Sequence, residues 1–296
     1  MIKRAGLGIT LALTAAGMYG FVPNFVRGAY ENGVPPIENT LFRTFLIAFM
    51  FAILAVVQGA RMTVPRQALP SFIGQSLATL FVSIGYLASV QFIKVGLAVI
   101  IFYFFPVLIM ICAPLVEGRN PGLLRILIAV IAFAGLAVAI GPDLESLDIR
   151  GILLAAAATC GAALQFFSGR SISRYMTPTV FGSLVHFAIL PVVLAVALLA
   201  GGGTLQIMPG GSANFTGLGF SLALAIVYVI AYMVHMLSLR FAPASTVAPF
   251  FNLEPVVATL VAVILLGERL QINQYVGGGL ILAALLLSSL IGRWKK

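Results

Sequence analysis

Ten continuous apolar segments run through almost the whole chain, with short connections between them. A helix needs about 20 mainly apolar residues to cross the hydrocarbon core of a bilayer. The segments that meet this requirement, numbered spans 1 to 10 in chain order, are 6–26, 38–59, 71–90, 95–116, 122–141, 150–168, 178–200, 217–239, 243–266 and 273–291. A transmembrane β-barrel would alternate apolar and polar residues, and these runs do not. The pattern predicts an all-α membrane protein with ten transmembrane helices.

The composition favours the same class. Of 296 residues, 61% are hydrophobic and 8% are charged, against about 25% charged in average soluble proteins. The net charge of +9 comes mostly from connections, so we interpret the basic residues as orientation signals rather than as a nucleic-acid surface. The expected partners are the lipid bilayer and a small-molecule substrate, and no nucleic acid.

No cofactor or metal site is expected. Cys112 and Cys160 lie inside apolar runs, and neither belongs to a CxxC motif or another metal-binding spacing. His186, in span 7, has no neighbour at a spacing typical of metal ligands. The acidic, His and Cys residues do not cluster within the predicted spans.

The distribution of charge predicts the orientation. With the N-terminus inside, the inner segments hold twelve Lys and Arg residues and the outer segments hold four. Basic residues concentrate in cytoplasmic loops. The terminal Arg293-Trp294-Lys295-Lys296 suits an inner interface, where Trp lies at headgroup depth and cations meet anionic lipid. We expect a multi-pass protein of a bacterial-type inner membrane, with both termini cytoplasmic.

An internal repeat adds a second constraint. Lys94–Ile140 and Pro243–Ser289 align without a gap at an offset of 149 residues. The identical pairs are Phe102/Phe251, Pro106/Pro255, Val107/Val256, Ala113/Ala262, Gly118/Gly267, Ala134/Ala283 and Leu136/Leu285. The alignment divides the chain into residues 1–145 and 146–296, with five spans each. Because five is odd, the two halves should be inverted relative to each other, which is the plan of many secondary transporters.

Glu254 is the most informative single residue. It falls near the middle of span 9, where an ionisable group costs about 2.5–3.5 kcal/mol on insertion scales and is by default a functional candidate. It could pair with a substrate ammonium or carry a coupling proton. The alternative is a protonated carboxyl group hydrogen-bonded to a neighbouring helix.

Prolines indicate breaks and candidate hinges in spans 1, 4 and 9: Pro23, Pro106, Pro249 and Pro255. Proline lacks the amide that would bond four residues back, and broken helices near the midplane are where transporters build sites. Passive kinks are the alternative, since proline is common in membrane helices. Asn252 and Glu254 are about 200° apart on an ideal helix, so both line one cavity only if the helix is distorted.

Span 8 carries Tyr228, Tyr232 and His235 at spacings that place them on one helix face. This stripe suits a pathway for aromatic or amphipathic solutes, although ordinary helix packing would also produce it. Because no Gly or Pro follows Gly219 in the span, we expect a regular helix.

Arg43 lies about one turn into span 2 and has two interpretations. It either snorkels to the interface or anchors a substrate carboxylate with its guanidinium fork. Further polar candidates within spans are Gln75, Tyr86, Tyr103 and Gln165. Each of these would also be explained by a helix–helix hydrogen bond.

The chain resembles the drug/metabolite transporter superfamily, EamA type. The second half carries the motifs Phe241–Ala248, Asn252–Ala258, Leu265–Arg269 and Gly277–Ala283, and the first half carries residues 17–26 and Pro106 with Gly118. The first half departs from the pattern in reading Glu117-Gly118-Arg119 where Gly-Glu-Arg is expected. The resemblance implies ten helices, a central cavity lined mainly by spans 1, 3, 4, 6, 8 and 9, and peripheral spans 5 and 10.

Function follows as an expectation. The resemblance implies a secondary transporter of small metabolites but does not fix its substrate. Many bacterial members export amino acids, including aromatic ones, and Glu254 with the span 8 stripe and Tyr103 would suit such substrates. A cationic drug or quaternary-amine exporter of the same fold is the alternative. A membrane-embedded enzyme is remote, because no nucleophile and base stand at matching depth and the chain has no GxxxxGK[ST], HExxH or GxSxG motif. The sequence leaves the oligomeric state open.

Overall fold

The computed structural model describes residues 2–141, 147–207, 211–266 and 269–294, and these residues form helices with no strand. The predicted fold class is confirmed: ten helical stretches of the described chain are long and apolar enough to cross a membrane. The α-helices are α1 (Ile2–Tyr19), α2 (Val22–Glu31), α3 (Pro36–Val57), α4 (Leu69–Leu80), α5 (Tyr86–Ser89), α6 (Val95–Phe102), α7 (Phe105–Val116), α8 (Leu123–Ile140), α9 (Ile149–Ile172), α10 (Pro178–Ala200), α11 (Phe215–Phe241), α12 (Ala244–Val247), α13 (Leu253–Leu266) and α14 (Ile272–Trp294).

Four spans are made of more than one helix. Span 1 combines α1 and α2, span 4 combines α6 and α7, and span 9 combines α12, a 3-10 helix at Ala248–Asn252 and α13. Span 3 combines α4 and α5 through a π-helix at Phe81–Gly85, preceded by a short 3-10 helix at Arg66–Ala68.

The candidate hinge prolines lie where these helices begin. Pro23, Pro106 and Pro255 occupy the first turns of α2, α7 and α13, and Pro249 lies in the 3-10 helix of span 9. The first turn tolerates proline because its amides have no partner within the helix. The prolines therefore restart helices rather than bend continuous ones.

Span 1 is longer than the sequence predicts. Its helix continues to Glu31 rather than ending near residue 26, so Arg27 lies within α2 and not in an outer connection. The extension has a local cause, since Arg27 Nε donates to Glu31 Oε1 at 2.9 Å across one helical turn, a spacing that stabilises helices.

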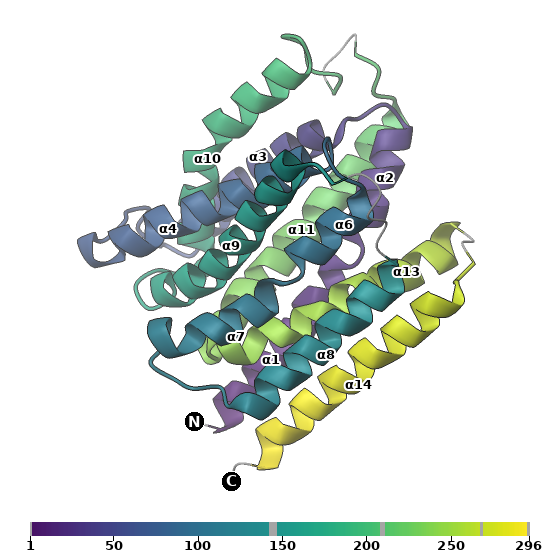
Figure 1. Cartoon of the computed structure of the whole chain (residues 1–296). Coiled ribbons are helices and arrows are strands. Elements are labelled where there is room, and N and C mark those ends of the chain that lie inside the picture. The colour runs from purple at the N-terminus through teal and green to yellow at the C-terminus, as the bar shows by residue number, and fades with distance from the viewer. Residues whose placement is uncertain (1, 142–146, 208–210, 267–268, 295–296) are drawn as a thin grey trace.

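The helices pair across the two halves. α1 lies along α11 and α4 lies along α9, so span 1 packs on span 8 and span 3 packs on span 6, the equivalent pair with the two halves interchanged. α3 pairs with α10, and α8 pairs with α14. Figure 1 shows both chain ends at one end of the bundle, here called the terminal end. The positions of residues 145–146, where the halves were divided, and of Gly267 and Glu268 lie outside the described residues.

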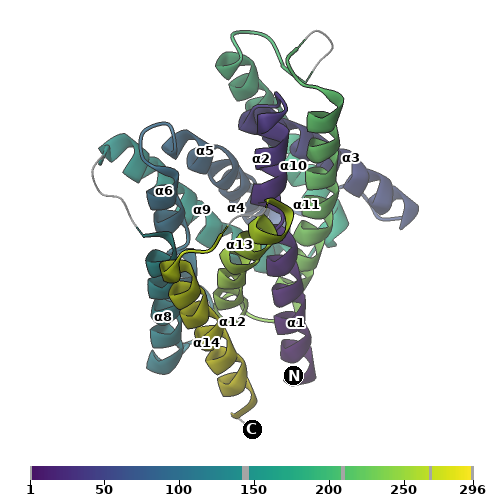
Figure 2. The same ribbon diagram turned by 90° about the vertical axis from the view of Figure 1, so that its right-hand side faces the viewer.

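α8 and α14 form a pair at the side of the bundle (Figure 2). They cross at Gly135 and Gly277, where a Cβ atom on Gly277 would lie 2.6 Å from the Ala139 Cβ and would also meet the Gly135 carbonyl. Small residues let membrane helices approach closely. This pair leaves the remaining spans to surround the candidate site.

Candidate transport site

Glu254 lies in the first turn of α13, immediately after the 3-10 helix. Its side chain is partly accessible. The Tyr103 hydroxyl interacts with the Glu254 carboxylate by a side-chain hydrogen bond, and Tyr19 and Tyr86 lie within electrostatic range of the same carboxylate. Three tyrosines, from spans 1, 3 and 4, therefore gather around the acid of span 9.

Helix breaks place Tyr103 at this point. α6 ends at Phe102 and α7 begins at Phe105, so Tyr103 lies in the gap between them. Pro106 cannot donate an amide hydrogen to the Phe102 carbonyl, which explains where α6 ends. The equivalent break in span 9 precedes Pro255 and presents Glu254.

Tyr19 connects the groups of the site, although the sequence did not single it out. Its ring centroid lies 5.2 Å from that of Tyr228, 6.1 Å from His235 and 6.2 Å from Phe251. Its hydroxyl lies within electrostatic range of both Glu254 and Arg43. The feature of the sequence that could have identified Tyr19 is its place in the 17–26 motif. There it is the last residue of α1, just before Gly20, where the helix breaks.

Arg43 points into the bundle. Its guanidinium carbon lies 4.3 Å from the centre of the Tyr228 ring, and its Nη2 donates to Ser83 Oγ at 3.3 Å. Ser83 is buried within the π-helix of span 3. Such π-helical turns often occur at functional sites. Arg43 thus lies among spans 2, 3 and 8, and Ser83 is a partner that the sequence did not reveal.

The span 8 stripe lies on an unbroken α11, as predicted. Its members have different surroundings. Tyr228 meets Tyr19 and Arg43, whereas Tyr232 is buried with its ring centroid 5.1 Å from that of His186. His235 is buried between Phe166 and Phe251, with both ring centroids 4.5 Å away.

The two predicted glutamines join helices. Gln75 is fully buried; its Nε2 donates to the Tyr232 hydroxyl at 3.3 Å, and its Oε1 accepts from Ser168 Oγ at 2.6 Å. Gln165 Nε2 donates to Thr79 Oγ1 at 3.1 Å. These bonds connect spans 3, 6 and 8. Tyr86 belongs instead with Glu254, and its ring packs 5.5 Å from that of Phe102.

Two buried polar atoms beside this aromatic cluster have no hydrogen-bond partner among the described residues: His235 Nε2 and Asn252 Oδ1. Asn252 is fully buried and its Nδ2 donates to the Pro249 carbonyl at 3.1 Å. Its burial therefore differs from the partial exposure of Glu254. Leaving a buried polar atom unpaired costs free energy, so both atoms keep unused hydrogen-bonding capacity beside the aromatic cluster.

No metal centre is evident in the part of the chain that the structure describes, since no three His, Cys, Asp or Glu side chains gather there. The charges at the site come from Arg43 and Glu254, and no ion pair joins these two residues.

Comparisons with known proteins agree with this architecture. The model of the EamA-like transporter family matches residues 6–141 and 149–290. A solved crystal structure shares the fold with a TM-score of 0.82 and 18% sequence identity, over 97% of this chain and 98% of the other. A comparison with curated proteins gives no match. Because the family model covers nearly all of both halves, the chain belongs to the EamA-like transporter family, a family of small-molecule membrane transporters.

Proposed function

We propose that this protein is a secondary transporter that exports amino acids, aromatic ones included, by alternating access through the site around Glu254. The observation that carries this proposal is the pair of separated, opposite charges of Arg43 and Glu254, with the Tyr19 and Tyr228 rings between them. Arg43 comes from the first half of the chain and Glu254 from the second.

The chemistry of an amino acid fits these groups. Its ammonium group would pair with the Glu254 carboxylate, and its carboxylate would pair with the guanidinium fork of Arg43. The cluster of Tyr19, Phe166 and Phe251 would accept an aromatic side chain. A zwitterion neutralises both charges at once, whereas a substrate with a single charge leaves one of them unpaired in a low-dielectric site.

The helix breaks supply the means of movement. Tyr103 and Glu254 sit at breaks in spans 4 and 9, and Tyr19 sits at the break in span 1. Small rotations at Pro23, Pro106, Pro249 and Pro255 would move these side chains relative to the unbroken α9 and α11. Alternating access requires such rocking of one part of the bundle against another.

A second candidate function is the export of organic cations. Three tyrosines around one carboxylate resemble the aromatic surroundings that recognise quaternary ammonium groups. Arg43 argues against this candidate, because a cation without a carboxylate leaves the guanidinium unpaired.

Flux into and out of proteoliposomes distinguishes the two candidates. Labelled phenylalanine, phenethylamine and tetraethylammonium would be compared with and without a proton gradient. Saturable phenylalanine flux that exceeds phenethylamine flux supports amino-acid transport. Flux of the two cations without phenylalanine flux supports the second candidate instead. A dependence on the proton gradient that is lost in Glu254→Gln would assign Glu254 a coupling proton in addition to the substrate ammonium.

The proposed location is a bacterial-type inner membrane with both termini in the cytoplasm. It rests on the excess of Lys and Arg in the connections at the terminal end. Cysteine labelling at the two ends of the bundle, in intact cells, tests this orientation.

A further inference from the structure

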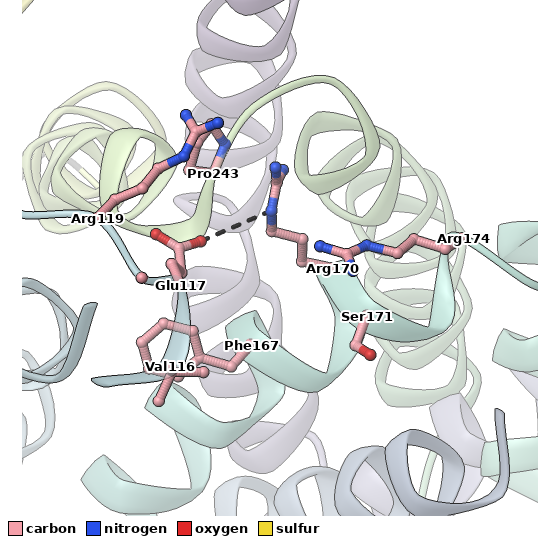
Figure 3. A pocket seen from close by; sticks show the side chains of 9 residues that line it. Val116, Glu117, Arg119, Phe167, Arg170, Ser171, Arg174 and Pro243 are labelled. Carbon is pink, nitrogen blue, oxygen red and sulfur yellow. Dashed lines mark ion pairs between the residues drawn. The ribbon is translucent and has the colours of Figure 1, made fainter. Parts of the chain in front are cut away.

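A cavity of about 530 Å³ lies where α7 and α9 end, at the terminal end of the bundle. We call it the vestibule. Its walls include Glu117, Arg119, Phe167, Arg170 and Arg174. Figure 3 shows Arg119 and Arg170 on either side of Glu117, Arg174 beyond Arg170, and a dashed line between Glu117 and Arg170. None of these residues belongs to the site around Glu254.

Glu117 ties the two halves of the chain together. Its Oε1 accepts from the Ala244 amide at 2.7 Å, and its Oε2 accepts from Ser245 Oγ at 2.6 Å. Its Oε1 also lies 3.6 Å from Arg170 Nε. Arg170 Nη1 in turn donates to the Leu239 carbonyl at 3.0 Å. One carboxylate thus links span 4 to spans 6 and 9, and Arg170 extends the link to span 8.

The link between Glu117 and Arg170 is incomplete. A well-formed guanidinium–carboxylate pair has N–O distances of about 2.7–2.9 Å and often two parallel bonds, whereas this pair has one contact at 3.6 Å. Arg170 has five N–H donors to offer, and its hydrogen bond to Leu239 uses one of them. The guanidinium retains donors for another acceptor.

Positive charge is in excess in the vestibule. Arg119 and Arg174 both lie within electrostatic range of Arg170, and both are exposed. Neither guanidinium group makes a hydrogen bond or ion pair with the described residues. Three arginines therefore line a cavity that has one carboxylate, and that carboxylate is already engaged with α12. A cavity with this imbalance attracts anions, and its walls focus the field on them.

We propose that the vestibule is a second binding site, which takes a carboxylate group and in which that carboxylate competes with Glu117 for Arg170. The proposal rests on the proposed function in identifying the carboxylate as that of the transported amino acid. Arg119 and Arg174 attract the anion, and Arg170 binds it. Release of Arg170 from Glu117 removes one of the contacts between spans 4 and 6 at this end of the bundle.

The test is equilibrium binding of labelled N-acetylphenylalanine to the purified full-length protein in phosphatidylcholine nanodiscs. This probe keeps the carboxylate but has no ammonium group for Glu254. We expect saturable binding to the wild type. The affinity should fall about tenfold or more in the double variant Arg119→Gln/Arg174→Gln, as for the loss of charge-assisted contacts. The matched control, Arg66→Gln, removes an exposed charge at the start of span 3 and should bind like the wild type.

If the carboxylate of the probe competes with Glu117 for Arg170, substitution of Glu117 should raise the affinity for the probe rather than lower it. Glu117→Gln removes the competing charge while keeping an oxygen that accepts from the Ala244 amide, so it should bind the probe several-fold more tightly. A merely structural role for Glu117 would not tighten binding. Any of three results would overturn the proposal: no saturable binding to the wild type, an affinity of the double variant Arg119→Gln/Arg174→Gln equal to that of the wild type, or a lower affinity of Glu117→Gln.

A lipid phosphate is the other source of an anion at this depth. Nanodiscs that contain phosphatidylglycerol separate the two sources. If the probe binds in both membranes, the vestibule binds soluble carboxylates. If phosphatidylglycerol abolishes binding, the vestibule is a headgroup site and the proposal fails. Because the probe bypasses Glu254, the result also stands apart from any failure of amino-acid transport in proteoliposomes.

Discussion

The Tyr103 hydroxyl meets the Glu254 carboxylate across the boundary between the two halves of the chain. The two residues are not equivalent in the repeat. At the offset of 149 residues, Tyr103 corresponds to Asn252 and Glu254 corresponds to Phe105. The duplicated break near Pro106 and Pro255 therefore carries aromatic chemistry in one half and a charge in the other, and the fold brings the two together.

Removal of the Tyr103 hydroxyl tests this contact. Tyr103→Phe keeps the ring but removes the donor to Glu254, so we expect phenylalanine flux at low substrate concentration to fall about tenfold. The measurement is the concentration dependence of flux in proteoliposomes. Tyr175→Phe is the control, because Tyr175 is exposed at the surface. Equal effects of the two substitutions would remove Tyr103 from the site.

Glu254→Gln tests the charge itself. Glutamine has nearly the same shape, so the helix start at Leu253 should persist, while an ammonium group loses its partner. We expect phenylalanine flux to fall at least about tenfold and any dependence on the proton gradient to disappear. Glu31→Gln, which alters an exposed ion pair with Arg27, is the control. An unchanged rate and pH profile would contradict a role for the carboxylate.

Arg43→Lys tests recognition of the substrate carboxylate. Lysine keeps the charge but lacks the planar fork, so the KM for phenylalanine should rise about tenfold. The KM for phenethylamine, which has no carboxylate, should not change. Arg66→Lys provides the same substitution at an exposed position. If both substrates respond equally to Arg43→Lys, Arg43 supports the structure rather than the carboxylate.

Tyr19 should determine the preference for aromatic substrates. Tyr19→Ala removes the ring that contacts Tyr228, His235 and Phe251, and an aromatic pair is worth about 0.5–1.5 kcal/mol beyond burial. The ratio of phenylalanine to alanine flux should fall about fivefold. Tyr19→Phe should retain the ratio, as should Tyr275→Ala on the exposed face of α14.

The crossing of α8 and α14 should depend on Gly277. A Cβ atom there collides with Ala139 and the Gly135 carbonyl, so Gly277→Ala should destabilise the protein by about 1–3 kcal/mol. Thermal unfolding in detergent measures the effect. Gly278→Ala is a stringent control, because a Cβ atom on the neighbouring Gly278 meets nothing within 4 Å. Equal melting temperatures for the two variants would mean that the helices can separate without cost.

Much of the site could be predicted because charged residues and helix breakers are unfavourable within apolar spans and therefore stand out in the sequence. Glu254 and Arg43 are charges in apolar spans, and Pro106 and Pro255 are helix breakers within them. Tyr19 and Ser83 could not be predicted in the same way. Tyr19 belongs to no stripe of polar residues like the one in span 8, and Ser83 is a small polar residue in an apolar run. The role of each depends on the neighbours that it contacts in the folded protein.

The sequence by itself determined the class of protein, the number of spans and the places where helices break. These are local properties, set by the length of apolar runs and by the missing amide of proline. Only the tertiary structure decided that Tyr103 meets Glu254, that Arg43 lies over Tyr228, and that Glu117 holds the start of α12. Those contacts join residues more than 100 positions apart, and they arise from how the spans pack, which no local pattern specifies.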